Sequence, residues 1–260
     1  MAKIVAIGSN KGGARKSTTA VRLAEALARA GRDVIVGDGD PQANATRRLA
    51  VDPGTGPTIN DVVYDARPGA AAHALYPCGW DAPWAKHIRV LPGEADFENR
   101  TDEAPRVGAH RRLAKALKGV GGDDTIILLD SPPGLGHITQ LTLAASRWAL
   151  GTTEPEHDSV KGALVYKAFV EDSAEDLGVP DLTWLGVIVS GYDQRVAGHR
   201  GQVAGCRELF GNQLWSPHVP RRSVLTDADE YARPLGTTTQ DREVLGAYQL
   251  HATHLLETVS

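Results

Sequence analysis

Lys11-Gly12-Gly13-Ala14-Arg15-Lys16-Ser17-Thr18 stands between a short apolar run at residues 4–7 and an amphipathic run that begins near residue 16. A glycine-rich turn between a strand and a helix directs backbone N–H groups, a lysine and the positive end of the helix dipole to one point, where they favour a phosphate. The stretch is close to the P-loop pattern G-x-x-x-x-G-K-[ST], but Asn10 replaces the first glycine and Arg15 the second. It therefore predicts a strand–turn–helix unit that binds nucleotide phosphates.

Each residue of this turn has an expected task. Lys16 would reach the β- and γ-phosphates, Ser17 would offer its hydroxyl to Mg²⁺, and the two glycines let the backbone approach the phosphates closely. Arg15 occupies a position that glycine usually serves, and a non-glycine residue with a left-handed backbone costs on the order of 1 kcal/mol. The residues expected to bind the nucleotide here are Lys11, Gly12, Gly13, Ala14, Arg15, Lys16, Ser17 and Thr18.

Size and composition narrow the class of protein. The chain has 260 residues, of which 42% are hydrophobic and 23% charged, typical of a soluble globular protein. Its formal net charge is −4, so any contact with nucleic acid has to come from a local basic patch. The two cysteines, Cys78 and Cys206, form no disulfide framework, which favours a reducing cytoplasm.

Short apolar runs alternate with longer amphipathic ones along the chain, which predicts an α/β fold with a mostly parallel sheet and helices on both faces. We expect residues 1–260 to form a single three-layer P-loop NTPase domain, without an N-terminal helix-turn-helix domain because the first strand begins at once. Residues 50–103 give weak signals and are interpreted as insertions on that domain. The expected strands are 4–7, 34–37, 88–91, 126–129, 149–152, 185–189 and 214–219, and the expected helices are 16–30, 109–118, 138–146, 159–177, 201–210 and 242–258.

Two acidic motifs follow predicted strands. Asp38-Gly39-Asp40-Pro41-Gln42 ends the second strand, and Asp130-Ser131-Pro132-Pro133 ends the apolar run at residues 126–129. Acids at the carboxyl edge of a parallel sheet beside a P-loop can hold Mg²⁺ or its waters and orient an attacking water. Either motif alone could also be a solvated turn, because Asp, Gly and Pro are turn residues.

Taken together, these motifs resemble the deviant Walker A ATPases of the ParA/MinD type. That family carries K-G-G-x-G-K-[ST], D-x-D-P-Q and D-x-P-P in this order. Three later segments resemble its Q-P-E, Y-D-x-R and I-P-R stretches, namely Thr153-Glu154-Pro155-Glu156, Tyr192-Asp193-Gln194-Arg195 and Val219-Pro220-Arg221. Within the family the chain is most similar to short, Soj-like ParA proteins that segregate plasmids or chromosomes.

The resemblance implies an ATPase that hydrolyses ATP to ADP and phosphate. ATP would join two subunits, with Lys11 of each reaching the phosphates of the other and Asp40 positioning the attacking water. Lys11, Lys16 and Asp40 are then the catalytic residues, and Pro220 and Arg221 lie near the base. Magnesium would be held by Ser17, Asp130 and Asp38, partly through water.

The same resemblance implies partners: a second copy of the chain, non-specific DNA of the nucleoid, and a ParB-type centromere-binding protein that stimulates slow hydrolysis. Basic residues gather in the last third of the chain, and among them Arg195 and Arg222 are the expected DNA contacts. An ordinary solvated surface would explain the same residues. The basic residues are Arg195, Arg200, Arg207, Arg221, Arg222 and Arg233.

Two other functions fit parts of the sequence. A MinD-like ATPase that positions the division site usually ends in a basic amphipathic helix, whereas residues 248–257 have no Lys or Arg, so we expect no membrane binding. A nucleotide-insensitive binding protein would result if Arg15 inactivated the loop. Retention of the two lysines, the serine and the acids of the three motifs favours a working switch.

Overall fold

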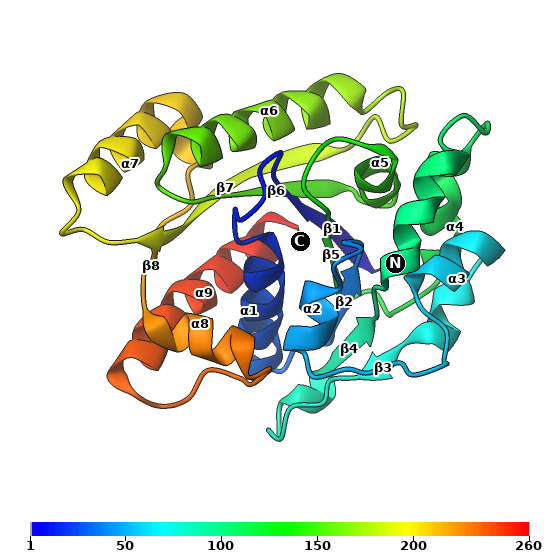
Figure 1. Ribbon diagram of the computed structural model, residues 1–260, viewed down its shortest axis with the longest axis horizontal. Helices are drawn as coiled ribbons and strands as arrows, with labels where there is room; N and C mark the ends of the chain where they lie inside the picture. Colours follow the sequence, from blue (N-terminus) through cyan, green and yellow to red (C-terminus); the bar gives the residue numbers. More distant parts are fainter. Residues whose placement is uncertain (1, 260) are drawn as a thin grey trace.

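The structure is a computed structural model that describes residues 2–259, and within them eight strands form one sheet in the order β3-β4-β2-β5-β1-β6-β7-β8 (Figure 1). All neighbouring strands are parallel except β3 and β4. The strands are β1 (Lys3–Gly8), β2 (Val34–Asp38), β3 (Tyr76–Pro77), β4 (Ile88–Leu91), β5 (Ile126–Asp130), β6 (Trp148–Thr153), β7 (Thr183–Tyr192) and β8 (Val219–Pro220).

Helices cover both faces of this sheet, which confirms the predicted three-layer α/β fold (Figure 1). Because successive strand residues point to opposite faces, Val5 and Ile7 of β1 pack under α1, α2, α8 and α9, while Ala6 packs under α5, α6 and α7. The helices α3 and α4 cover the second face further along the sheet. The helices are α1 (Lys16–Arg29), α2 (Asn44–Arg48), α3 (Ile59–Asp65), α4 (Arg112–Leu117), α5 (His137–Ala144), α6 (His157–Ser173), α7 (Ala197–Phe210), α8 (Ser223–Glu230) and α9 (Thr239–Thr258).

The register of the central strands places the motifs together. Asp130 at the end of β5 is level with Ile7 of β1 on one side and with Asp38 of β2 on the other. The P-loop leaves β1 at this same carboxyl edge and enters α1. The topology therefore gathers the P-loop and both acidic motifs at one edge of the sheet, as parallel strands require.

Several predicted elements differ from those observed. The strand expected at residues 214–219 is reduced to β8 and an isolated bridge from Leu214 to Val187, because Pro217 and Pro220 have no N–H to donate to a ladder. The helix expected at residues 109–118 is a 3₁₀ turn followed by the short α4. In α9 the first turn begins earlier than expected, at Thr239, where Thr238 and Asp241 form a capping box.

Candidate nucleotide site

The backbone of the P-loop takes the conformation that its position in the motif demands. Arg15 has φ 59° and ψ 30°, in the left-handed region that costs a residue with a Cβ on the order of 1 kcal/mol. Its Nε donates to Oε1 of Glu154, just after β6, over 2.7 Å, and the Arg15 side chain is 26% exposed. The arginine therefore keeps the backbone angle of a glycine, and Glu154 holds its side chain.

The P-loop rests on α6 through close backbone contacts. A Cβ built on Gly162 would lie 2.8 Å from the Cβ of Lys11, and the N–H of Asn10 donates to the Gly162 carbonyl over 3.2 Å. Similarly, a Cβ on Gly8 would collide with the ring of Tyr166 from the same helix. The position of the loop, and of Lys11 on it, is therefore set by α6.

The two lysines of the P-loop lie in contrasting environments. Lys16 is buried, its Nζ donates to the Lys11 carbonyl over 3.3 Å, and burial lowers its pKa against the opposing charges of Asp130 and Asp40. The ammonium of Lys11 is exposed and has no hydrogen-bond or ion-pair partner within residues 2–259. Lys16 thus points into the chain's own site, while Lys11 is available to a group outside it.

The three acids meet at the ends of β2 and β5, but their hydrogen bonding differs. Asp38 accepts from the N–H and the hydroxyl of Thr46, each over 2.7 Å, and from the Asp40 N–H over 3.2 Å. Burial raises the pKa of Asp38 to about 6 against the donors from Thr46. Asp38 is therefore occupied in fixing the loop that carries Asp40 and the start of α2.

Asp130 is fully buried, and both its carboxylate oxygens lack a hydrogen bond of good geometry from any described residue. Burial, followed by the charge of Asp38, raises the pKa of Asp130 to about 8, while the Ser17 hydroxyl and the Lys16 ammonium oppose the rise. A buried carboxylate without a donor is costly unless a cation or donor completes it. The residues present therefore fit a divalent cation beside Ser17 and Asp130.

Such a cation would need ligands from outside the protein as well. Within residues 2–259 no group of three or more His, Cys, Asp or Glu side chains is arranged to hold a metal ion by itself. Magnesium is commonly bound by one or two protein oxygens together with waters and phosphate oxygens. The donor set here suits Mg²⁺ that arrives with a nucleotide.

A basic cleft of about 1060 Å³ lies beyond β7 and β8, lined partly by Pro220 and Arg221. The two predicted DNA contacts line it, but both are paired with acids: Arg195 bonds Asp193 through Nε and Nη2, and Arg222 bonds Glu243 in the same way. Among the described residues, three arginines that line this cleft have no acidic partner. They are Arg207, Arg221 and Arg242.

Comparisons with known proteins identify the family to which the chain belongs. A profile of the family described as "AAA domain" matches residues 2–177. The "Chromosome-partitioning ATPase Soj" of Thermus thermophilus is 30% identical over 256 residues, covering 98% of this chain and 96% of that protein. The chain belongs to the ParA/MinD-type family of P-loop ATPases. The "Chromosome partitioning protein ParA" of Myxococcus xanthus is also similar to this chain, 29% identical over 90% of the chain and 80% of that protein.

Several solved structures have the same fold as this chain. The ADP- and magnesium-bound cobyrinic acid a,c-diamide synthase of Mycobacterium smegmatis has a TM-score of 0.76 at 25% identity, covering 89% of this chain and 93% of its own. The ATP complex of Cyanothece McdA(D38A) has a TM-score of 0.80 at 22% identity, with 96% of each chain covered. MinD of Pyrococcus horikoshii with Mg-ADP reaches 0.74 at 22%, covering 100% and 99%. Within residues 2–259 of the chain, no helix is long and apolar enough to cross a membrane.

Some residues that shape the site were not predicted. Thr18 was expected at the nucleotide, but its hydroxyl donates to Asp229 on α8 over 2.6 Å, which leaves its backbone N–H for a phosphate. Glu154 was noted for its motif, and its contact with Arg15 was not foreseen. An arginine in a glycine position of the P-loop is a signal in the sequence that an acid lies nearby. By contrast, the sequence around Asp229 gives no indication of its contact with Thr18.

Proposed function

We propose that this chain is a DNA partition ATPase that works as an ATP-driven dimer, with ATP/ADP and Mg²⁺ as its ligands. The exposed and unpaired Lys11 is the observation that carries the proposal, because it stands on a loop fixed by α6 and its ammonium is bound to no described residue. In a face-to-face dimer it would place its charge on the phosphates of the second copy and neutralise charge that develops during transfer.

Within one subunit the residues divide the work. Lys16 binds the β- and γ-phosphates, and Ser17 and Asp130 hold Mg²⁺, which neutralises phosphate charge when it is bound. Asp40 is 7% exposed and accepts from the Gln42 N–H over 3.0 Å, so its carboxylate is held at the edge of the site, where it can orient a water. Asp38 acts mainly by fixing this loop through Thr46.

The basic cleft supports non-specific binding of DNA, with the protein associated with the nucleoid. Arg207, Arg221 and Arg242 have no acidic partner among the described residues, so they meet phosphates without first breaking an ion pair. Arg195 and Arg222 stay predicted contacts, although each has to exchange an aspartate or glutamate for a phosphate. Release of DNA would follow hydrolysis, stimulated by a ParB-type centromere-binding partner.

A DNA-binding titration with ATP, ADP and no nucleotide tests this function. We expect the wild type to bind duplex DNA tightly only with Mg·ATP, with an affinity that falls steeply with salt, by a log–log slope of roughly −0.9 for each phosphate contact. Lys16→Ala should lose the response to ATP, and Lys11→Ala should bind ATP without hydrolysing it. Lys86→Ala, which removes an exposed lysine far from the P-loop, is the control.

Equal DNA binding under all three nucleotide conditions, in the wild type and in Lys16→Ala alike, would contradict the switch. That result would instead favour a nucleotide-insensitive binding protein. Isothermal calorimetry decides the matter independently, since Mg²⁺-dependent ATP affinity is required by the switch and absent from the alternative.

A further inference from the structure

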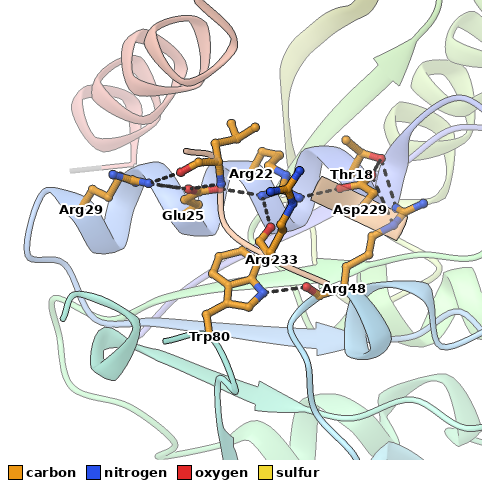
Figure 2. A network of polar contacts seen from close by, with 9 residues as sticks. Thr18, Arg22, Glu25, Arg29, Arg48, Trp80, Asp229 and Arg233 are labelled. Atoms are coloured by element: carbon orange, nitrogen blue, oxygen red, sulfur yellow. Dashed lines mark hydrogen bonds and ion pairs between the residues drawn. The ribbon is translucent and has the colours of Figure 1, made fainter. Parts of the chain in front are cut away.

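Asp229, near the end of α8, contacts two elements of the nucleotide site at once (Figure 2). Its Oδ2 accepts from the Thr18 hydroxyl over 2.6 Å and lies 3.3 Å from Nε of Arg48 on α2, while its Oδ1 accepts from Nη2 of Arg22 over 2.8 Å. Arg48 also donates from Nη1 to the Thr18 hydroxyl over 3.1 Å. Asp229, Thr18, Arg22 and Arg48 are named the Asp229 network below.

The Asp229 network is largely buried, and Glu25 beside it supplies the second acid that balances the charges of Arg22 and Arg48. The side chains of Arg22 and Glu25 are 0% exposed, and that of Asp229 is 11% exposed. Arg22 donates from Nη1 to Glu25 over 2.7 Å and to the Arg233 carbonyl over 3.2 Å. Hydrogen bonds between charged groups in such a low-dielectric setting are strong and fix the geometry of the groups that make them.

The three segments that meet at Asp229 each carry part of the proposed activity. Thr18 directly follows Ser17 in the first turn of α1. Arg48 ends α2, the helix whose Thr46 holds Asp38. Asp229 belongs to α8, which begins directly after Arg221 and Arg222 of the basic cleft.

We propose that Asp229 is a positioning residue that couples the occupancy of the phosphate site to the placement of α8 and of the basic cleft beside it. A nucleotide that draws in the first turn of α1 moves Thr18, and through Asp229 this displacement reaches α8. By linkage, a polyanion that holds α8 in the nucleotide-bound position raises the affinity for the nucleotide by the same factor. The inference rests on the nucleotide-binding part of the proposed function.

The contacts of Glu25 and Arg29, on the other side of Arg22, supply a control for the Asp229 network. Glu25 accepts from Arg29 and from the Leu235 N–H over 2.9 Å, and Arg29 donates to the Leu235 carbonyl over 2.7 Å. These contacts pin the segment before α9 to α1 but reach neither Thr18 nor α2 (Figure 2). Arg29→Ala therefore removes stabilising contacts from the cluster without touching the Asp229 network.

Hydrogen exchange of the α8 amides, measured with and without Mg²⁺ and the non-hydrolysable analogue AMP-PNP, tests the coupling. In the wild type we expect saturating analogue to change α8 exchange by about fivefold or more, the lower range of measured coupling energies. Asp229→Asn should bind the analogue within about tenfold of the wild-type affinity and lose the change in α8. Arg29→Ala should retain the change in α8 exchange even though it lowers the stability. Glu230→Gln, on the exposed face of α8, should retain it as well.

A second pair of variants keeps the test decisive if Asp229→Asn does not fold. Thr18→Val deletes the hydroxyl that reaches Asp229 and should lose the α8 response, while Thr18→Ser retains the hydroxyl and should restore it. An α8 response that is absent from the wild type, or that survives in Asp229→Asn or Thr18→Val at saturation, overturns the inference while leaving nucleotide binding intact. Failure of the wild type to bind the analogue in calorimetry overturns the proposed function and the inference with it.

Discussion

In the motif region (residues 3–48 and 126–133), each functional side chain stands within a few residues of the strand that positions it. Asp38 and Asp130 end their own strands, and Lys16 follows the turn after β1. In the carboxyl-terminal region (residues 183–259), side chains are held by residues far away in the chain. Thr18 and Asp229, for example, are separated by 211 positions.

This contrast separates two ways of building a site. The motif region concentrates charge that is not internally satisfied, with two acids, Asp40 and Asp130, acting on Lys16 and a carboxylate that lacks donors. The carboxyl-terminal region contributes matched pairs, as between Arg22 and Asp229. A region with unsatisfied groups is prepared for a ligand, whereas one with matched groups holds its neighbours in place. Substitutions at unsatisfied groups should therefore affect activity, and substitutions within matched pairs should affect stability.

Lys16→Ala tests the motif region and should give the largest effect. Removing the lysine beside the phosphates should lower ATP hydrolysis by about a thousandfold, because preorganised charge at the reacting group is lost. The free energy of unfolding should change by no more than about 1 kcal/mol, since Asp130, with its raised pKa, can take up a proton instead. Phosphate release measures the loss of hydrolysis, and urea unfolding measures the loss of stability. A decrease in the free energy of unfolding that exceeds the increase in the activation free energy would contradict the contrast between the two regions.

Arg22→Met tests the matched pairs, because Arg22 on α1 supplies a cation to Asp229 of the carboxyl-terminal region. It should lower the free energy of unfolding by about 3 kcal/mol, because it leaves Glu25 and Asp229 buried with fewer cations. Urea denaturation measures the loss, and Arg32→Met, at an exposed position just after α1, should change stability by less than about 0.5 kcal/mol. If the two variants unfold at the same urea concentration, the buried pairs do not stabilise the fold as argued.

The same contrast explains how much could be predicted from sequence. Parallel strands with a glycine-rich turn and acids at their ends are local patterns, so the three-layer fold and the placement of the P-loop and both acidic motifs at one edge of the sheet were predicted correctly. The position of Lys11 follows from the packing of its backbone and Cβ against Gly162 in α6, and that contact joins two elements whose spacing no local pattern fixes.

Long-range contacts account for what sequence alone did not provide. Nothing near Asp229 distinguishes it from a surface acid on an amphipathic helix, and only the packing of α8 on α1 brings it to Thr18. The partner of Arg195 is local, at Asp193 two positions earlier, whereas Arg222 reads as a free cation in the sequence because Glu243, 21 positions away, is brought to it only by the helix α9. Propensity and motif spacing are silent about such pairs.

A smaller effect in the carboxyl-terminal region is the loss of folding stability at acid pH that the buried His251 causes. His251 on α9 is 0% exposed, and burial lowers its pKa to about 4. In the unfolded chain a histidine titrates near pH 6.5, so between about pH 6.5 and 4 the unfolded state binds a proton that the folded state does not. Stability from this residue is complete above pH 6.5 and should decline by roughly 2–3 kcal/mol as the pH falls to 4.

His251→Leu isolates this contribution. Asp38 and Asp130 have raised pKa values and therefore act in the opposite direction, stabilising the folded state as the pH falls. Their effect is common to both proteins, so it cancels in the difference between the urea-unfolding free energies of wild type and variant. That difference should shift in favour of the variant from pH 7 to pH 4; a difference that is flat with pH contradicts a buried neutral imidazole.

Arg15 gives the smallest expected effect, because it combines a left-handed backbone in the P-loop with a matched ion pair between its side chain and Glu154. Two substitutions separate these roles. Arg15→Ala loses the bond to Glu154 and keeps the left-handed backbone strain, whereas Arg15→Gly loses the bond and relieves the strain. Thermal or urea unfolding should therefore show Arg15→Gly to be more stable than Arg15→Ala by about 1 kcal/mol.

The wild type should fall between these two variants or close to Arg15→Gly, since a partly exposed ion pair contributes roughly 0.2–1 kcal/mol. Glu154→Gln, which retains an acceptor but removes the charge, should lie within about 0.5 kcal/mol of the wild type. If Arg15→Ala and Arg15→Gly are equally stable, the left-handed backbone at residue 15 carries no strain. In that case the arginine is held only by its side chain, and the P-loop tolerates it without the penalty that its φ of 59° implies.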